Sequence, residues 1–363
     1  MQDQDYMRRA IELAKKGTGF TNPNPLVGAV IVKDGRIIGE GYHARYGELH
    51  AERNAIASLT ESAEGATLYV TLEPCCHYGK TPPCTEAILE QKIARVVIGS
   101  RDPNPLVSGK GAALLRQHGI LVEEDFLKEE CDELNPVFFH YMTTKTPYVV
   151  MKYAMTADGR IATKTGASKW ITGEAARQQV QWMRHQYMGI LVGIGTVLAD
   201  DPLLTVRQKG WRSPVRIICD SHLQIPLDCR IMQTASDYPT IVACAQADPE
   251  KSSQLMAKGI QVITVPGTDG RVDLPKLMHV LGQQGIDSIL AEGGGTLHDS
   301  LRSAGLIHRL EVFIAPKLFG GAQAKSPIEG DGVAEVADAL QFQLQHIQQF
   351  GQDVLLTYHP VPH

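Results

Sequence analysis

The sequences HAE at residues 50–52 and EPCCHYGKTPPC at residues 73–84 decide the fold of the first half of the chain. His50 and Glu52 stand at the start of a predicted helix over residues 51–59, and Cys75 follows a strand-like run at 66–72. One imidazole and two thiolates can hold a tetrahedral zinc ion and leave its fourth position for a water molecule, which zinc acidifies. Glu52 lies close enough in the sequence to move protons without being a ligand.

The third metal ligand stays open on spacing alone. The order H-x-E, then P-C and a further cysteine, resembles zinc-dependent nucleobase deaminases. Here eight residues separate Cys75 from Cys84, so Cys76 and His77 are rival ligands. We favour Cys84, because Pro82 and Pro83 can end a loop and present it at the first turn of a helix. A closed structural site of three cysteines and one histidine is the alternative, but such a site has no use for Glu52.

The surrounding sequence predicts an α/β domain. A helix is expected over residues 5–16, followed by a β-hairpin of residues 26–33 and 36–42 around the turn dipeptide Asp34-Gly35. Strands and helices then alternate, which indicates crossover connections and a sheet with helices on both faces. The expected strands are 66–72, 95–98 and 120–122, and the expected helices are 85–91 and 111–118.

The chain length predicts two domains. At 363 residues it corresponds to about 2.4 domains of average size. A polar helix over 127–142 leads into residues 143–147, which lack an apolar period and end in Pro147. We therefore predict domains at 1–145 and 146–363. The second domain shows a further α/β series, with strands near 148–155, 189–193, 215–219, 240–244, 261–265, 288–291 and 309–315, and helices near 173–185, 249–258, 274–282 and 296–304.

Composition excludes several classes of protein. The net charge is −5 and no block of like charges is present, which disfavours a nucleic-acid partner. The chain shows no signal peptide, and its longest apolar stretch, 189–199, is too short to span a bilayer, so a soluble cytoplasmic protein without a membrane partner is expected. Seven cysteines argue against a disulfide framework, and four of them are predicted core residues: Cys131, Cys219, Cys229 and Cys244.

The second domain carries weaker signals. The sequence AEGGGT at 291–296 follows a strand and opens a helix, where backbone N–H groups can cradle a phosphate, although a plain connecting turn fits equally well. Gly193 and Gly195 also follow a strand, but Leu198 stands where a dinucleotide fingerprint needs its third glycine. The corner at Asp200 can be catalytic or ordinary turn chemistry.

These motifs, with TNPNPLVG at 21–28, resemble the deaminase half of the bifunctional riboflavin-biosynthesis enzymes, the diaminohydroxyphosphoribosylaminopyrimidine deaminase/5-amino-6-(5-phosphoribosylamino)uracil reductases. The eight-residue separation is that family's own form of the motif. The resemblance implies a cytidine-deaminase-like three-layer α/β/α fold with His50, Cys75 and Cys84 on zinc and Glu52 as proton shuttle. It also implies substrate contacts at Asn24, His43, His77 and Lys80, for which solvated loop residues are the plain alternative.

The second half resembles the reductase half of the same enzymes, in the segments 151–162, 168–172, 192–196, 199–207 and 292–294. The resemblance implies a dihydrofolate-reductase-like α/β fold. It implies substrate contacts at Lys152, Ser168, Arg184, Leu204, Arg207 and Glu292. It implies NADPH contacts at Ala154, Trp170, Thr196, Asp200, Ser221, Gly294, Gly295, Thr296, Leu297, His298, Asp299 and Ser300. Without the resemblance, Trp170 would be a core aromatic and Arg184 a solvated helix residue.

The expected function is therefore bifunctional. The first domain would deaminate a phosphorylated diaminopyrimidine with zinc, and the second would reduce the ribosyl group of the product with NADPH, in a homo-oligomer. A deaminase of nucleic-acid bases is one competitor, and the acidic charge balance argues against it. A structural zinc protein with a nucleotide-sensing domain is another, and Glu52 distinguishes it from an enzyme.

Overall fold

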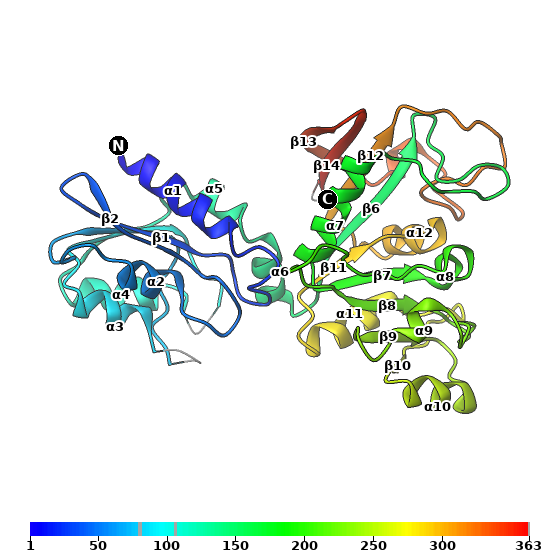
Figure 1. Ribbon diagram of the computed structural model, residues 1–363, viewed down its shortest axis with the longest axis horizontal. Coiled ribbons are helices and arrows are strands. Elements are labelled where there is room, and N and C mark those ends of the chain that lie inside the picture. Colours follow the sequence, from blue (N-terminus) through cyan, green and yellow to red (C-terminus); the bar gives the residue numbers. More distant parts are fainter. Residues whose placement is uncertain (79–81, 105–106, 362–363) are drawn as a thin grey trace. The chain divides into compact units, whose positions relative to one another are not determined.

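The structure is a computed structural model that describes residues 1–78, 82–104 and 107–361 (Figure 1). The chain divides into two compact units, Met1–Lys145 and Thr146–His363. Each unit has its own sheet and its own apolar cores. None of the helices in the described residues is long and apolar enough to cross a membrane.

The first unit is built on a five-stranded mixed sheet in the order β2-β1-β3-β4-β5. β1 runs antiparallel to both β2 and β3, while β3, β4 and β5 are parallel. The β1–β2 turn has Asp34 and Gly35 at φ +49° and +73°, the left-handed pair that a tight hairpin requires and that the dipeptide predicted. The strands are β1 (Gly28–Lys33), β2 (Arg36–Tyr42), β3 (Thr67–Leu72), β4 (Arg95–Ser100) and β5 (Leu121–Glu123).

Helices cover both faces of this sheet, which gives the predicted three layers. Met7 and Ile11 of α1 share a core with Val30 and Cys131 on one face, and Ala55, Ile88 and Leu115 of three other helices pack on the opposite face. Gly41 lets α2 approach β2, because a Cβ atom there would lie 2.2 Å from the backbone nitrogen of Ala55. The helices are α1 (Asp3–Lys15), α2 (Ala51–Ala57), α3 (Cys84–Glu90), α4 (Lys110–Gln117), α5 (Lys128–Asp132) and α6 (Pro136–Thr144).

The single polar helix expected over 127–142 is in fact two helices, α5 and α6, so that expectation is wrong. Pro136 lacks the N–H group needed to continue a helix, and it stands instead at the first position of α6. The side chain of Asn135, between the two helices, bonds both backbone groups of Leu26 at 2.8 and 2.9 Å. This long-range pairing anchors the break.

The second unit contains a nine-stranded sheet in the order β10-β9-β8-β7-β11-β6-β12-β14-β13. Neighbouring strands from β10 to β12 are parallel, and β14 and β13 add antiparallel pairs at one edge. The strands are β6 (Tyr148–Thr156), β7 (Gly189–Gly193), β8 (Val215–Cys219), β9 (Thr240–Cys244), β10 (Gln261–Thr264), β11 (Ser288–Ala291), β12 (Arg309–Ala315), β13 (Phe342–Phe350) and β14 (Asp353–Pro360).

Successive strand residues feed two cores on opposite faces of the sheet. Leu191 and Ile217 join one core with residues of α11 and α12, whereas Ile190 and Ile218 join the other with residues of α8, α9 and α10. The helices are α7 (Glu174–Gln186), α8 (Ile194–Asp200), α9 (Arg230–Gln233), α10 (Pro249–Ala257), α11 (Leu274–Gln283), α12 (Gly295–Ser303) and the short 3₁₀ helix η1 (Val336–Asp338). Of the four predicted core cysteines, Cys219 alone is only half-buried.

The terminal hairpin of β13 and β14 was not among the elements predicted from the sequence. β13 is exposed along almost its whole length, and its centre is rich in glutamine. The alternation of apolar and polar residues covers only residues 342–345 and breaks off in this glutamine-rich centre, so the strand signal is weak.

Candidate active sites

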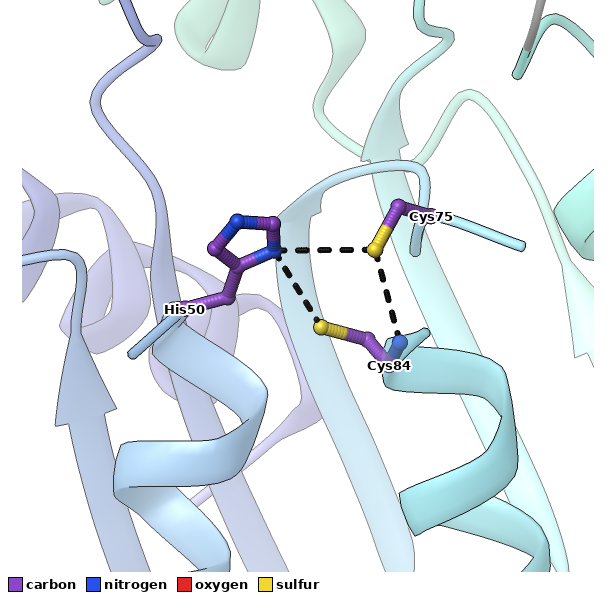
Figure 2. Close-up of side chains that lie close together, drawn as sticks. All are labelled: His50, Cys75 and Cys84. Carbon is purple, nitrogen blue, oxygen red and sulfur yellow. Dashed lines mark hydrogen bonds between the residues drawn. The ribbon is translucent and has the colours of Figure 1, made fainter. Parts of the chain in front are cut away.

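Three predicted metal ligands come together at one end of the first sheet (Figure 2). His50 is the N-cap residue of α2, Cys75 follows β3, and Cys84 is the first residue of α3. The Nδ1 atom of His50 lies 3.6 Å from the Sγ atom of Cys75 and 3.4 Å from that of Cys84. All three donor atoms lie within 4.8 Å of one another.

This donor set fits a zinc ion. With a tetrahedral angle and typical Zn–N and Zn–S bonds, a nitrogen and a sulfur ligand are separated by about 3.5 Å, which agrees with both distances. The group contains neither Cys76 nor His77, so within the described residues the geometry favours Cys84 as the third ligand.

Backbone hydrogen bonds hold the thiols of Cys75 and Cys84 close together. The backbone N–H of Cys84 points to the Sγ atom of Cys75 at 3.4 Å, and the N–H of Thr85 donates to the carbonyl of Cys75 at 3.2 Å. A hydrogen bond from the Cys84 thiol lowers the pKa of Cys75 to about 4, although burial opposes this shift, and the same bond raises the pKa of Cys84. One of the two sulfurs is thus a thiolate ready for a metal.

Glu52 is a buried acid beside the same group of metal ligands, and it lines the same cavity as His50 and Cys75. It belongs to the first turn of α2 and is only 3% exposed. Burial raises the pKa of its carboxyl group, and the negative charge of Cys75 adds to the shift. A carboxyl group with a raised pKa exchanges protons nearer neutral pH, as a proton shuttle requires.

A cavity of about 280 Å³ opens over this cluster. His50, Glu52 and Cys75 line it, together with three of the four residues predicted to contact substrate: Asn24, His43 and His77. The fourth, Lys80, lies outside the described residues. The cavity therefore gathers the predicted metal site and most of the predicted substrate contacts into one pocket.

His43 is a neutral member of this pocket. Burial lowers its pKa, and its Nδ1 atom lies 3.0 Å from the carbonyl oxygen of Leu49, to which it donates. Its Nε2 atom then accepts a hydrogen bond from the Nδ2 group of Asn24 at 3.2 Å. His43 is thus a hydrogen-bonding wall residue, and not the solvated loop residue of the alternative interpretation.

Two further polar residues of the pocket escaped the sequence analysis. Asp102 and Asn104 follow β4 and line the cavity. Burial raises the pKa of Asp102 to about 6, and its Oδ1 atom accepts the backbone N–H of Asn104 at 2.8 Å. Polar residues directly after a parallel strand are a known sign of a site, because ligands bind at the carboxyl ends of such strands.

Glu73, the first residue of the motif at 73–84, has a structural role. Its buried carboxylate accepts backbone N–H groups from Gly109, Gly111 and Ala112 at 2.9, 3.0 and 3.2 Å. These groups belong to the N-terminal end of α4, where a carboxylate is favoured by the helix dipole. Glu73 therefore fixes α4 beside the metal site.

In the second unit, three predicted substrate residues form a buried ionic cluster. The guanidinium group of Arg184 donates to both carboxylate oxygens of Glu292, at 2.7 and 2.9 Å, and the Nζ atom of Lys152 lies 3.3 Å from Oε2. Burial alone would raise the pKa of Glu292, but the charges of Arg184 and Lys152 lower it to about 2. Arg184 is 14% exposed, so it is not a solvated helix residue.

The predicted cofactor residues at the two glycine turns lie side by side. The N–H of Gly193 donates to the carbonyl of Gly293 at 3.1 Å, and a Cβ atom on Gly294 would lie 3.7 Å from Oγ1 of Thr196. This contact joins the start of α8 to the start of α12. The backbone N–H groups at a helix N-terminus favour a phosphate group.

Most side chains of the predicted run 294–300 already have partners within the protein. Leu297 packs in a core, and His298 is buried with its Nδ1–H donating to the carbonyl of Pro327 at 2.9 Å. Asp299 pairs with Arg302, and the hydroxyl of Ser300 donates to Thr296. Gly295 is buried against Glu329, so within the predicted run 294–300 the half-buried Gly294 and the exposed Thr296 are the best placed to meet a cofactor.

The other predicted residues of this unit lie on loops and strand ends. Trp170 is 57% exposed and stacks under the guanidinium of Arg177 at 4.7 Å, which rules out a core aromatic. The hydroxyl of Ser168 donates to Asp200 at 3.3 Å. Ala154 lies in β6, Ser221 follows β8, Leu204 is buried with φ +57°, and Arg207 is exposed.

Two family models match the chain. The model described as "Cytidine and deoxycytidylate deaminase zinc-binding region" matches residues 1–100, which contain His50, Glu52, Cys75 and Cys84. The model described as "RibD C-terminal domain" matches residues 147–356. The two matches follow one another along the chain, as the two units do.

Curated relatives and solved structures match along nearly the whole length. Riboflavin biosynthesis protein RibD of Actinobacillus pleuropneumoniae is 55% identical, over 99% of this chain and 95% of the relative, and that of Escherichia coli is 44% identical, over 98% and 99%. The Acinetobacter baumannii RibD structure has a TM-score of 0.88 at 39% identity and covers 99% of both chains. The crystal structure of a diaminohydroxyphosphoribosylaminopyrimidine deaminase/5-amino-6-(5-phosphoribosylamino)uracil reductase from Thermotoga maritima has a TM-score of 0.88 at 40% identity and covers 99% of this chain and 98% of that chain.

A pocket that fits zinc, a second unit with paired glycine turns and these full-length matches agree with one another. The chain therefore belongs to the RibD family, and it is a bifunctional deaminase and reductase of riboflavin biosynthesis.

Proposed function

We propose that residues 1–145 hydrolytically deaminate 2,5-diamino-6-(5-phospho-ribosylamino)pyrimidin-4(3H)-one to 5-amino-6-(5-phospho-ribosylamino)uracil. Residues 146–363 then reduce the ribosyl group of this product with NADPH to give 5-amino-6-(5-phospho-ribitylamino)uracil. The observation that carries the proposal is the pair of 3.6 and 3.4 Å donor distances from His50 beside the buried carboxyl group of Glu52.

In the first domain, His50, Cys75 and Cys84 hold the zinc ion. When bound, zinc makes a water molecule nucleophilic near neutral pH. Glu52 would move two protons in turn at its carboxylate: the first goes from the attacking water to the pyrimidine ring nitrogen, and the second goes from the hydroxyl group that this water adds to the ring to the amino group, which leaves as ammonia. Its burial supports this part, because a raised pKa brings proton uptake and release closer in energy.

The walls of the pocket hold the phosphorylated substrate. Asn24, His43, His77 and Lys80 are the proposed contacts, and the Asn24–His43 hydrogen bond supports two of them by fixing their orientation. Because both ring nitrogens of His43 already have hydrogen-bond partners, His43 contacts the substrate through its ring and orients the amide of Asn24, while Lys80 supplies the positive charge for the phosphate.

In the second domain, NADPH supplies the hydride. The proposed cofactor contacts are Ala154, Trp170, Thr196, Asp200, Ser221 and the run 294–300, and the joined starts of α8 and α12 support a phosphate site there. The proposed substrate contacts are Lys152, Ser168, Arg184, Leu204, Arg207 and Glu292. Arg184 spends two of its donors on Glu292, so it orients that carboxylate, and exposed Arg207 is the freer cation for a substrate phosphate.

We further propose that the enzyme is a homo-oligomer. β13 forms an open sheet edge on which Leu344 and Ile347 are 46% and 65% exposed. An exposed edge strand with apolar side chains invites pairing with another chain.

The substitution Glu52→Gln in the full chain tests the deaminase. Zinc should stay bound and ammonia release should be abolished, while NADPH oxidation with the deaminated intermediate continues. Glu61→Gln, on the surface beside Arg36, is the matched control. Unchanged ammonia release by Glu52→Gln would refute the proposed chemistry.

The substitution Lys152→Met tests the reductase in the same chain. It should abolish NADPH oxidation and spare ammonia release, whereas Lys209→Met, at an exposed position, should change neither. Full NADPH turnover in Lys152→Met would remove Lys152 from the proposed site.

A further inference from the structure

Arg53 ties the helix that carries His50 and Glu52 to the segment that delivers Cys84. It follows Glu52 directly in α2. Its Nε group donates to the carbonyl oxygen of Pro82 at 3.1 Å, and its Nη2 group donates to that of Pro83 at 2.9 Å. One guanidinium thus grips two consecutive carbonyls.

These two carbonyls directly precede a proposed metal ligand. Pro83 is the N-cap residue of α3, and Cys84 is the first residue of that helix. Because prolines have no N–H group, Pro82 and Pro83 can be held through their backbone only by donors to their carbonyls. Arg53 supplies such donors from the helix that bears the other half of the site.

The segment between Cys75 and Cys84 is also tied on its other flank. The hydroxyl of Tyr78 lies 2.7 and 2.9 Å from the two carboxylate oxygens of Glu86, in the first turn of α3. Tyr78 fixes the segment to α3 itself, however, and does not connect α3 to α2. Among the contacts of the described residues, the bonds of Arg53 set the position of Pro82 and Pro83 relative to His50.

We propose that Arg53 is a positioning residue of the metal site, which sets the separation of Cys84 from His50 and so the affinity for zinc. This inference rests on the proposed function, because it takes His50, Cys75 and Cys84 as the ligands. Arg53 does not line the cavity and touches none of the reacting groups assigned above. Groups that orient metal ligands from behind typically contribute 10- to 100-fold to metal affinity.

The guanidinium group of an arginine suits this positioning role. A planar guanidinium presents several N–H donors in a fixed fork, so it can hold two acceptors at once, whereas a lysine ammonium is a flexible point charge. No carboxylate in the described parts of the chain forms an ion pair with Arg53. Its hydrogen bonds therefore serve the Pro82–Pro83 segment and not a surface salt bridge.

The test compares zinc affinity in the full chain carrying Arg53→Leu, Arg53→Lys or the control Arg36→Leu. Arg36 is an exposed arginine of the same unit that pairs with Glu61. Zinc is titrated against a chromophoric chelator, and the absorption of the cobalt-substituted protein reports the geometry of the thiolate ligands. Circular dichroism and the melting temperature of each variant check that the first unit is folded.

We expect Arg53→Leu to weaken zinc binding by about 10- to 100-fold and to alter the cobalt spectrum. Arg53→Lys should recover part of the affinity, and Arg36→Leu should equal the unsubstituted chain. A role in stability alone would lower the melting temperature of Arg53→Leu without changing its zinc affinity, and that result would overturn the inference. If the unsubstituted chain bound no zinc, the proposed function would fall and the inference with it.

Discussion

The side chains of Arg184 and Glu292, 108 positions apart in the chain, form a two-pronged ion pair with N–O distances of 2.7 and 2.9 Å. Arg184 comes from α7, and Glu292 follows β11. The remaining Nη1 group of Arg184 donates to the carbonyl of Thr205 at 3.1 Å, in the loop that carries Leu204 and Arg207. The pair therefore joins Glu292, a proposed substrate contact, to the loop that carries two others, Leu204 and Arg207.

Loss of this arginine should be costly. Arg184→Met leaves Glu292 buried with Lys152 as its remaining partner, and breaking a buried pair in this way typically costs about 3–5 kcal/mol. We expect a lower free energy of unfolding for the second unit and loss of NADPH oxidation, with ammonia release unchanged. Denaturant titration and the two activity assays measure these effects. The stability and NADPH oxidation of Arg184→Lys should lie between those of the unsubstituted chain and those of Arg184→Met. Normal reductase activity in Arg184→Met would contradict the assignment.

The same pair predicts a dependence of stability on pH. The pKa of Glu292 is about 2 in the folded chain, against an ordinary value of 4.5. Between these values the unfolded chain binds more protons, so stability is fully present above about pH 4.5 and is lost as the pH falls toward 2. The loss should be on the order of 3 kcal/mol. Glu292→Gln should flatten this part of the stability profile, and an unchanged slope below pH 4.5 would contradict the prediction.

Asp102 predicts a trend of the opposite sign. Burial raises its pKa to about 6 from 3.8, so between these values the folded chain binds more protons and stability falls as the pH rises. Asp102→Asn removes this penalty and keeps an oxygen for the N–H of Asn104. We expect the variant to be more stable than the unsubstituted chain by about 1–3 kcal/mol above pH 6 and equal to it below pH 4. Melting temperatures across this range would show the difference, or its absence.

The rival cysteines can be separated by zinc content. Cys84→Ser removes a donor that lies 3.4 Å from Nδ1 of His50, so zinc should be lost or held far more weakly, and ammonia release should fall with it. Cys76→Ser should keep one zinc ion per chain, because Cys76 is not part of the ligand group. Elemental analysis after dialysis decides between them, and the reverse result would make Cys76 the ligand.

Arg216 predicts a purely structural loss. Its side chain is fully buried and binds two threonine hydroxyls, of Thr240 and Thr234, at 2.9 and 2.8 Å. It also donates to backbone carbonyls of residues 203, 231, 234 and 238. Burial lowers its pKa to about 10, so it stays charged at neutral pH. Arg216→Met leaves these acceptors unpaired and should cost at least about 3 kcal/mol in denaturant titration. A loss below about 1 kcal/mol would mean that water replaces the arginine.

The sequence by itself determined the fold class of both units and most of their helices and strands, because local periodicity and turn chemistry are properties of near neighbours. The hairpin at Asp34-Gly35 and the zinc motif are examples. Features that depend on contacts between residues far apart in the chain could not be predicted in this way. The break before Pro136 needed Leu26 to bind Asn135, and β13 has no buried face because it lies at a sheet edge.

The candidate sites divide in the same way. Spacing alone identified His50, Glu52 and Cys75, but it left Cys84 and Cys76 as rivals, since spacing does not tell which sulfur turns toward the imidazole. The start of α3 favours Cys84, because it places Sγ of Cys84 3.4 Å from Nδ1 of His50. Asp102 enters the pocket because parallel strands bring residues far apart in sequence to one edge of a sheet. Arg184 meets Glu292 because α7 places its side chain beside the end of β11. The residue types needed at each site are therefore recognisable in the local sequence. Their assembly into a site depends on contacts between residues that lie far apart in the chain.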